Sequence, residues 1–275
     1  MTDTFELTIL SQNILLSKTH EESGEILPQT ERIKTIARAI LAMPYRPDIV
    51  GIQEAHIENG FNNGVDLARL CGYEMSTWAN HNQKATPPVK KQGRKGEFIG
   101  LIGVNKAQAK VIELGDKRRA LMTEIGGIAF ATLHFRAGGS DAISNRLENA
   151  HNLIAALEDF DDAVVFGDFN EPRAKFFTPG REYIKQAGYS SVFSLQGKPS
   201  PKTYPIGGYK KLDGRHIRWA LDDILVRGKR VRPTETGVLT HDSRSLTAGS
   251  AYPNALDGTD HNGVWARLKI APKHD

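Results

Sequence analysis

A change from apolar to polar character in residues 164–170 is the first sign of chemistry in this sequence. The run begins Val-Val-Phe, which suits a buried strand, and continues Gly-Asp-Phe-Asn, which predicts that the strand ends there. Because side chains alternate along a strand, Asp168 and Asn170 share a face with Phe166. A carboxylate at the mouth of a core can hold a hard cation or a water molecule, and an amide can bind a phosphate. Taken alone, the segment predicts a simple turn about equally well.

The same change of character recurs at other strand ends. Asn13 ends the inward face of the first alternating run, and Glu54 extends the apolar face formed by Val50 and Ile52. His134 likewise ends an alternating run. Each residue also has an ordinary structural interpretation, as a cap, a surface side chain or a rim histidine.

Two acidic positions in the second half of the chain complete the set. Asp222 and Asp223 interrupt the apolar run 220–226, where carboxylates are costly unless something pairs with them. Asp260 and His261 precede the final strand-like segment. It would be a coincidence if every one of these residues had only its ordinary structural role. We therefore expect them to share one site.

The combined set has the parts of metal-assisted phosphoester hydrolysis. It offers oxygen ligands for a hard cation, a histidine next to an acid, and a second histidine with amides to hold an oxyanion. An aspartate placed behind a histidine would fix its tautomer and hold it ready to deprotonate water.

Alternation and helical spacing predict the elements that must position these residues. Two amphipathic helices are expected over residues 29–43 and from residue 147 to residue 157, with shorter helices over 65–71 and 181–187. The expected strands cover residues 5–16, 48–54, 98–104, 109–114, 120–125, 127–134, 164–170, 220–226 and 264–270. We expect 98–104 to pair with 109–114, and 120–125 with 127–134. This order predicts an α/β protein with layered sheets and helices.

Composition narrows the class of protein. The chain has 275 residues, of which 39% are hydrophobic and 25% charged, and this is typical of a globular protein. We expect one domain, residues 1–275, since no linker, repeat or low-complexity tract divides it. There is no apolar run long enough to anchor it in a membrane and no signal peptide, and the single cysteine, Cys71, fits a reducing compartment, so we expect a cytoplasmic protein. The net charge of +4 favours anionic partners weakly.

The chain resembles the endonuclease/exonuclease/phosphatase superfamily, also called the DNase I-like fold. Six motifs occur in the family's order and span nearly the whole chain: Ser11-Gln12-Asn13, Gly51-Ile52-Gln53-Glu54, Thr132-Leu133-His134-Phe135, Gly167-Asp168-Phe169-Asn170, Leu221-Asp222 and Gly258-Thr259-Asp260-His261. The resemblance implies a two-sheet β-sandwich flanked by helices, in four α/β/β/α layers, with the site at one rim.

The resemblance also implies the roles of the motif residues. Glu54 would be the principal ligand of Mg²⁺, with Asn13 and Asp260 nearby, and Mn²⁺ is the alternative metal.

Asp168 would position the attacking water, and Asn170 and His134 would bind the scissile phosphate. His261 would be the general base, oriented by Asp222.

Three positions qualify the resemblance. Asp222 matches the family's aspartate better than Asp223, which falls where the family often has an aromatic residue. His134 places the chain among members with histidine, not tyrosine, at this position. Asn262-Gly263 replaces residues that commonly end in proline after the Asp-His pair, which can alter the loop but leaves the catalytic residues intact.

Basic residues in the expected loops point to nucleic acid as the substrate. We expect two long basic loops, residues 80–97 and 199–218, to flank the site, and Arg146 in the first turn of its helix to face an anionic partner. The expected substrate-binding residues are Arg146, Lys91, Arg94, Lys95, Lys210 and Lys211. The layout of residues 197–204 is similar to that of cytosolic bacterial members and, faintly, of tyrosyl-DNA phosphodiesterases.

The sequence therefore predicts a Mg²⁺-dependent phosphodiesterase, a nuclease or an enzyme that processes nucleic-acid ends. One alternative is a phosphatase or phospholipase acting on a small or lipid phosphate, as phosphoinositide phosphatases and sphingomyelinases do. Another is a non-catalytic phosphate-binding scaffold, which the presence of Glu54, Asp168 and His261 disfavours. Nothing in the sequence indicates an obligate protein partner.

Overall fold

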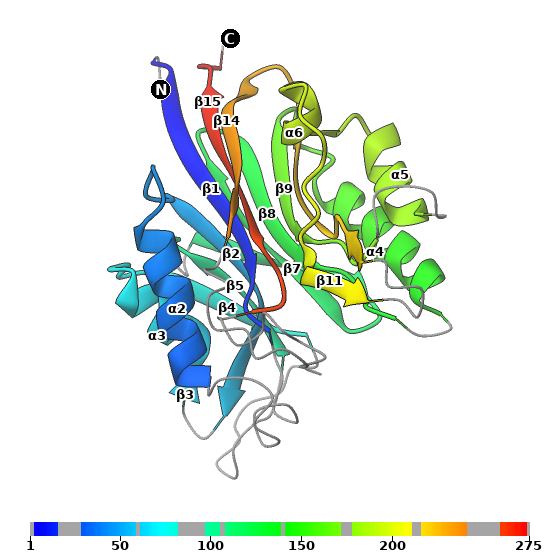
Figure 1. Ribbon diagram of the computed structural model, residues 1–275. Helices are drawn as coiled ribbons and strands as arrows, with labels where there is room; N and C mark the ends of the chain where they lie inside the picture. Colours follow the sequence, from blue (N-terminus) through cyan, green and yellow to red (C-terminus); the bar gives the residue numbers. More distant parts are fainter. Residues whose placement is uncertain are drawn as a thin grey trace, which may run out of the picture.

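Two β-sheets pack face to face in the computed structural model (Figure 1). The structure describes residues 3–15, 29–58, 61–81, 97–104, 108–138, 141–171, 178–210, 216–240 and 259–273. The first sheet has the strand order β14-β15-β1-β2-β5-β4, with the short β3 beside β2. Its strands are β1 (Phe5–Asn13), β2 (Ile49–Glu58), β3 (Phe61–Asn62), β4 (Ser76–Asn80), β5 (Glu97–Ile102), β14 (Val231–Leu239) and β15 (Gly263–Ile270).

The second sheet has the order β10-β13-β9-β8-β7-β6. Its strands are β6 (Ala109–Gly115), β7 (Arg118–Ile125), β8 (Ile128–His134), β9 (Ala163–Asp168), β10 (Ser190–Ser191) and β13 (Asp222–Arg227). A separate hairpin pairs β11 (Tyr204–Lys210) with β12 (His216–Trp219). The helices are α2 (Gln29–Leu41), α3 (Asn63–Leu70), α4 (Ala142–Ala156), α5 (Pro179–Gln186) and α6 (Val192–Leu195).

Alternation along the strands sorts the apolar side chains into three buried layers. Ile9 and Phe166 belong to the layer between the sheets. Their neighbours in sequence point the other way: Leu10 packs with the layer that includes residues of α2, and Val165 packs with the layer that includes residues of α4. Each fully buried side chain of this kind contributes about 1.5–3 kcal/mol. The result is a helix–sheet–sheet–helix arrangement, as Figure 1 shows.

Two motif glycines allow the layers to approach closely. A Cβ on Gly51 would lie 2.4 Å from Thr132 Oγ1 and 2.5 Å from Phe166 Cε2, so only glycine lets the facing sheet pack there. Gly167 has a φ of +150°, and a Cβ there would lie 2.0 Å from the Leu133 carbonyl oxygen. Both positions need glycine for the backbone that carries the site.

Strand direction brings the polar strand ends to one rim. β1 and β2 are parallel, and so are β8 and β9, so each pair ends at the same edge of its sheet. β15 runs antiparallel to β1, and β13 runs antiparallel to β9, so these two strands begin where the others end. Asp222 is consequently directly opposite Asp168, which in turn is opposite His134.

Several predicted elements need correction. The expected pair of strands 98–104 and 109–114 is wrong, because β5 pairs with β2 and β4 in the first sheet whereas β6 pairs with β7 in the second. The expected basic loop 199–218 contains the hairpin of β11 and β12, despite its prolines and glycines. β14 was not predicted, and its proline fits an edge strand that needs no N–H on its outer side. The pairing of β7 with β8 is confirmed.

Within the described part of the chain, no helix is both long and apolar enough to cross a membrane.

Candidate active site

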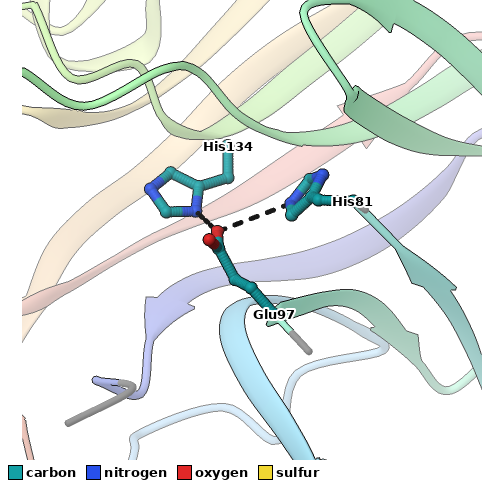
Figure 2. A group of neighbouring side chains, drawn as sticks. All are labelled: His81, Glu97 and His134. Carbon is teal, nitrogen blue, oxygen red and sulfur yellow. Dashed lines mark ion pairs between the residues drawn. The ribbon is translucent and has the colours of Figure 1, made fainter. Parts of the chain in front are cut away.

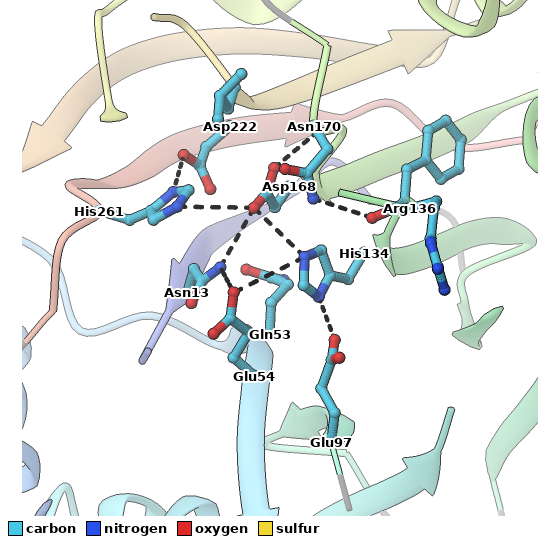
Figure 3. Close-up of polar contacts among 12 residues, drawn as sticks. Asn13, Gln53, Glu54, Glu97, His134, Arg136, Asp168, Asn170, Asp222 and His261 are labelled. Atoms are coloured by element: carbon cyan, nitrogen blue, oxygen red, sulfur yellow. Dashed lines mark hydrogen bonds and ion pairs between the residues drawn. The ribbon is translucent and has the colours of Figure 1, made fainter. Parts of the chain in front are cut away.

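One asparagine links two carboxylates at the rim (Figure 3). The Nδ2 group of Asn13 donates to Glu54 Oε1 at 2.9 Å and to Asp168 Oδ2 at 3.2 Å. The Oδ1 atom of Asn13 accepts the backbone N–H of Leu15 at 3.0 Å. Asn13 ends β1 as the sequence predicts, and it holds carboxylates from both sheets next to each other.

Glu54 lies beside Asn13 because of an irregularity in β2 that the sequence does not show. β2 does not end at Glu54 but continues to Glu58, and the register with β5 shifts between Ile52 and Ala55. At this bulge Glu54 has a φ of +58°, which is unfavourable for a residue with a Cβ. Ile52 packs on the helix-covered face of the sheet, whereas Glu54 turns to the side of Asn13. The prediction that Glu54 shares the face of Val50 and Ile52 is therefore wrong, because the bulge breaks the alternation.

His261 and Asp222 form a buried pair. The Nδ1 atom of His261 lies 2.8 Å from Asp222 Oδ2, and its Nε2 atom lies 3.8 Å from Asp168 Oδ2. Burial by itself would lower the pKa of His261, but the Asp222 and Asp168 carboxylates outweigh it and raise this pKa well above the usual value. The hydroxyl of Thr203 accepts the Asp222 backbone N–H at 3.2 Å, which fixes the start of β13.

Asp223 has a different set of partners from its neighbour. Its carboxylate accepts hydrogen bonds from Arg181 Nη1 at 3.2 Å and from Ser191 Oγ at 2.8 Å. The two adjacent acids thus lie at the beginning of β13, not at the centre of a strand, and each is paired separately. The geometry agrees with the assignment of Asp222 as the histidine partner.

A second histidine–carboxylate pair lies on the other side of Asp168. His134 Nδ1 is 2.6 Å from Glu97 Oε1, and His134 Nε2 is 3.6 Å from Asp168 Oδ2 and 4.0 Å from Glu54 Oε1. Nε2 is buried and has no hydrogen-bond partner among the described residues. Burial opposes protonation of His134, but Glu97 prevails and raises its pKa. The pKa of Glu97 is lowered, because contacts with His134 and Arg118 outweigh the effect of its burial.

Sequence reasoning missed Glu97. It stood at the end of a segment interpreted as a basic loop, where an acidic residue carries no signal. Its partner is 37 positions away in the other sheet, so neither alternation nor spacing links them.

Asp260 adds a buried carboxyl group to the rim. Its pKa is raised to about 6, chiefly by burial and also by the charges of Glu54 and Asp168, although His261 acts in the opposite direction. Negative charge is therefore concentrated at this edge of the sandwich.

Asn170 lies beyond the end of β9, with a φ of +50°. Its backbone N–H donates to Asp168 Oδ1 at 2.8 Å, and its Nδ2 donates to the Phe135 carbonyl oxygen at 2.9 Å. The segment therefore forms a turn, and this turn fixes the Asp168 carboxylate at the rim.

The structure tests the positions of only some of the expected substrate-binding residues. The first-turn argument for Arg146 is wrong, because α4 already begins at Ala142, and Arg146 has an internal partner, Glu171, at 3.4 Å. Lys210 lies in a strand, β11, not in a loop. Lys91, Arg94, Lys95 and Lys211 lie outside the described residues.

Solved structures resemble this chain, although no family model and no curated protein matches it. An endonuclease/exonuclease/phosphatase from Bacteroides vulgatus is 18% identical with a TM-score of 0.67, and the match covers 97% of this chain and 99% of that chain. A humanized TDP2 from D. rerio is 14% identical with a TM-score of 0.62, over 96% of this chain and 98% of that chain. D. rerio TDP2 complexed with a single-strand DNA product is also 14% identical, with a TM-score of 0.59, over 96% and 98%. The chain has the DNase I-like fold. The fold predicted from the six motifs is thereby confirmed.

The rim of this DNase I-like sandwich carries an aromatic wall beside His261. The ring of Tyr204 lies 4.5 Å from the imidazole of His261 and stacks on Trp219 at 6.2 Å, measured between ring centroids. Both aromatic residues come from the β11–β12 hairpin. Both rings are partly buried, so part of this aromatic wall is accessible beside His261.

Proposed function

We propose that this protein is a Mg²⁺-dependent phosphodiester hydrolase that acts on nucleic acid. The observation that carries the proposal is the position of Asp168. Two histidines point their Nε2 atoms at its Oδ2 atom from 3.6 Å and 3.8 Å, and each histidine is backed by a carboxylate. In such an arrangement a reacting phosphate would lie between two histidines. One histidine can accept a proton, and the other can donate a hydrogen bond to the phosphate.

The oxygen donors at the rim fit a hard divalent cation. Glu54 is the proposed principal ligand and Asp260 lies near it, while Asn13 holds the Glu54 carboxylate through its Nδ2 group. Mn²⁺ is the second choice of metal. The repulsion that helps to raise the pKa of Asp260 shows that like charges converge there, which a cation would relieve. When bound, the cation would stabilise negative charge on the phosphate. The strained backbone of Glu54 agrees with a functional role, since strain of this kind clusters at active sites.

His261 is the proposed general base and Asp168 orients the attacking water. The hydrogen bond from His261 Nδ1 to Asp222 leaves Nε2 to accept a proton on the side of Asp168. The gap of 3.8 Å between Nε2 and Asp168 Oδ2 is long for a direct hydrogen bond, and a water within reach of both atoms is placed for deprotonation. A positive charge near Asp168 and Asp260 would lower the pKa of His261 toward the range in which it can act as a base.

His134 and Asn170 are the proposed phosphate-binding residues. Glu97 holds the Nδ1 side of His134 and favours its charged form, so Nε2 can donate to a phosphate oxygen. Asn170 Nδ2 already donates to Phe135, so its second proton remains for the substrate.

Nucleic acid is the proposed substrate because an aromatic wall and an oxygen-rich metal site lie together. Tyr204 beside His261 can stack on a base or sugar, and base stacking of this kind is worth about 1–3 kcal/mol. A structurally similar protein, D. rerio TDP2, has been seen with a single-strand DNA product.

A substrate screen tests the proposal. Purified protein with Mg²⁺ or Mn²⁺ is assayed on single- and double-stranded DNA, RNA, phosphoinositides and a simple aryl diester, with Asp168→Asn as the inactive control. We expect cleavage of nucleic acid that needs the metal and disappears in the variant. Cleavage of phosphoinositides alone would contradict nucleic acid as the substrate and indicate a lipid phosphate instead. No cleavage of any substrate would contradict the assignment as a hydrolase.

A further inference from the structure

A second cluster of potential metal ligands lies behind His134, on the side away from Asp168. It consists of His81, Glu97 and His134, as Figure 2 shows. His81 follows β4, Glu97 begins β5, and His134 ends β8 in the facing sheet. The His81 Nε2, Glu97 Oε1 and His134 Nδ1 atoms all lie within 4.8 Å of one another. The catalytic role proposed for His134 uses its other nitrogen, Nε2.

His81 has a nitrogen without a partner that is directed into this cluster. Its side chain is buried, and its Nδ1 accepts the backbone N–H of Arg119 at 3.1 Å. Nε2 is buried, has no hydrogen-bond partner among the described residues, and lies 3.7 Å from Glu97 Oε1. Burial lowers the pKa of His81 to about 3, although Glu97 opposes this shift. The ring is therefore neutral, which is the form that binds metals.

Glu97 has an oxygen that the cluster does not use. His81, His134 and Arg118 all contact Oε1, and within the described part of the chain none of these contacts involves Oε2. The terminal torsion of a glutamate is broad and roughly two-fold, so rotation can offer Oε2 to a metal while Oε1 stays on Arg118. The Glu97 side chain is only partly buried, with 18% of its surface exposed among the described residues.

The spacing suits a small tetrahedral ion. With metal–ligand bonds of about 2.0–2.1 Å, tetrahedral ligands lie about 3.3 Å apart. Glu97 Oε1 is 3.7 Å from His81 Nε2 and 2.6 Å from His134 Nδ1, so small side-chain shifts satisfy this geometry.

We propose that His81, Glu97 and His134 form a binding site for Zn²⁺, separate from the oxygen-rich site of Mg²⁺. Two imidazole nitrogens and one carboxylate suit Zn²⁺, whereas Mg²⁺ prefers oxygen ligands and retains its waters. Three protein ligands leave a fourth position for water, so the ion can exchange. If the proposed hydrolase function holds, Zn²⁺ at this site inhibits the reaction, because it takes the Nδ1 atom through which Glu97 positions His134.

Arg118 sets the affinity of the site. Its Nη1 atom is 2.6 Å from Glu97 Oε1 and 3.4 Å from His134 Nδ1, so its charge repels a bound cation. The replacement Arg118→Gln should therefore strengthen Zn²⁺ binding.

Zinc titration in excess Mg²⁺ tests the proposal, because Mg²⁺ saturates the oxygen-rich site. Affinity is measured by competition with a chromophoric chelator, so the result does not depend on hydrolysis. The key variant is His81→Asn, whose side-chain oxygen can still accept the Arg119 N–H but which lacks the Nε2 ligand. His151→Asn is the matched control. His151 is an exposed residue of α4 that packs against Tyr183 of α5 and is not part of the cluster.

We expect His81→Asn to weaken Zn²⁺ binding by at least ~10–100-fold, the loss typical even of residues that only support a metal ligand. His151→Asn should bind like the wild type, and Arg118→Gln more tightly. Equal affinity of wild type and His81→Asn would overturn the proposal. If His81→Asn does not fold, as judged by its thermal transition, anomalous diffraction at the zinc edge from wild-type crystals decides, and density elsewhere refutes the site. Zinc binding without any hydrolase activity would contradict only the proposed function.

Discussion

Replacing Asp222 by asparagine separates the role of its charge from its role in the fold. The substitution preserves the shape of the side chain but removes the charge 2.8 Å from His261 Nδ1. A hydrogen bond to a charged group contributes about 1.5–3 kcal/mol, which corresponds to roughly 10- to 150-fold in rate. Stabilisation of the wrong imidazole tautomer can extend the loss to ~10⁴-fold. We therefore expect single-turnover cleavage to fall by ~10–10⁴-fold at saturating Mg²⁺.

The pH profile gives the mechanism a second test. The Asp222 carboxylate raises the pKa of His261, so its removal lowers this pKa. A general base must be deprotonated, and the acidic limb of the rate profile should accordingly move to lower pH in Asp222→Asn. Asp223→Asn is the matched control: it removes a buried carboxylate from the next position, where Arg181 is the partner, and should cost stability without moving the limb.

Double variants decide whether the two histidine–carboxylate pairs act as separate units. Asp222→Asn combined with His261→Ala should lose little more than the worse single variant, because residues that act as one unit are not additive. Asp222→Asn combined with Glu97→Gln should be multiplicative within about two- to three-fold, since each carboxylate lies behind its own histidine. A multiplicative loss in the first pair, or an unmoved acidic limb, would refute the assignment of Asp222 as the partner of a general base.

Two further predictions concern the metal and the packing. Glu54→Gln keeps the size of the side chain but removes a proposed ligand charge, and calorimetric titration should show much weaker Mg²⁺ binding, whereas unchanged affinity would contradict the assignment. Gly51→Ala should destabilise the protein by about 1–3 kcal/mol, since the added methyl would lie 2.4 Å from Thr132 Oγ1 and 2.5 Å from the ring of Phe166. Urea unfolding measures this loss, and an unaltered midpoint would show that the sheets can separate locally at no cost.

Alternation in sequence was enough to find the residues that end regular strands. Asn13, His134 and Asp168 each terminate a strand with one face buried between the sheets, and the period of two assigns such residues reliably. The parallel course of neighbouring strands then brings their ends together without further information.

Glu54 lies at the rim with Asn13, as the sequence predicts, but it reaches this position by a different geometry. The sequence pattern places it on the outer face with Val50 and Ile52, whereas a bulge with positive φ directs it to the rim. Glutamate has no preference for that conformation, so no local pattern could indicate it. The conformation depends on the surrounding strands, chiefly β5, whose register shifts at this point.

Contacts between distant segments account for what the sequence could not show. Glu97 is paired with a histidine of the opposite sheet, and the β11–β12 hairpin carries Tyr204 to the ring of His261. Proline and glycine near this hairpin indicate a loop by local rules, and the strands form nevertheless because they pair with each other. Strand pairing of this kind depends on how distant segments meet in the fold, which local sequence rules do not describe.

The charges at the rim explain why buried carboxylates and raised-pKa histidines occur together there. Glu54, Asp168 and Asp260 meet where β1, β2, β9 and β15 converge, and their mutual repulsion would exclude a phosphate diester. His261 and His134 offset part of this charge only because Asp222 and Glu97 stabilise their protonated forms. The carboxylates still outnumber the two imidazolium groups, so the rim attracts a divalent cation before it can attract a polyanion. In the proposed hydrolase a hard cation would therefore be needed for substrate binding at this edge as well as for the chemistry, and the first sheet would supply its proposed ligands.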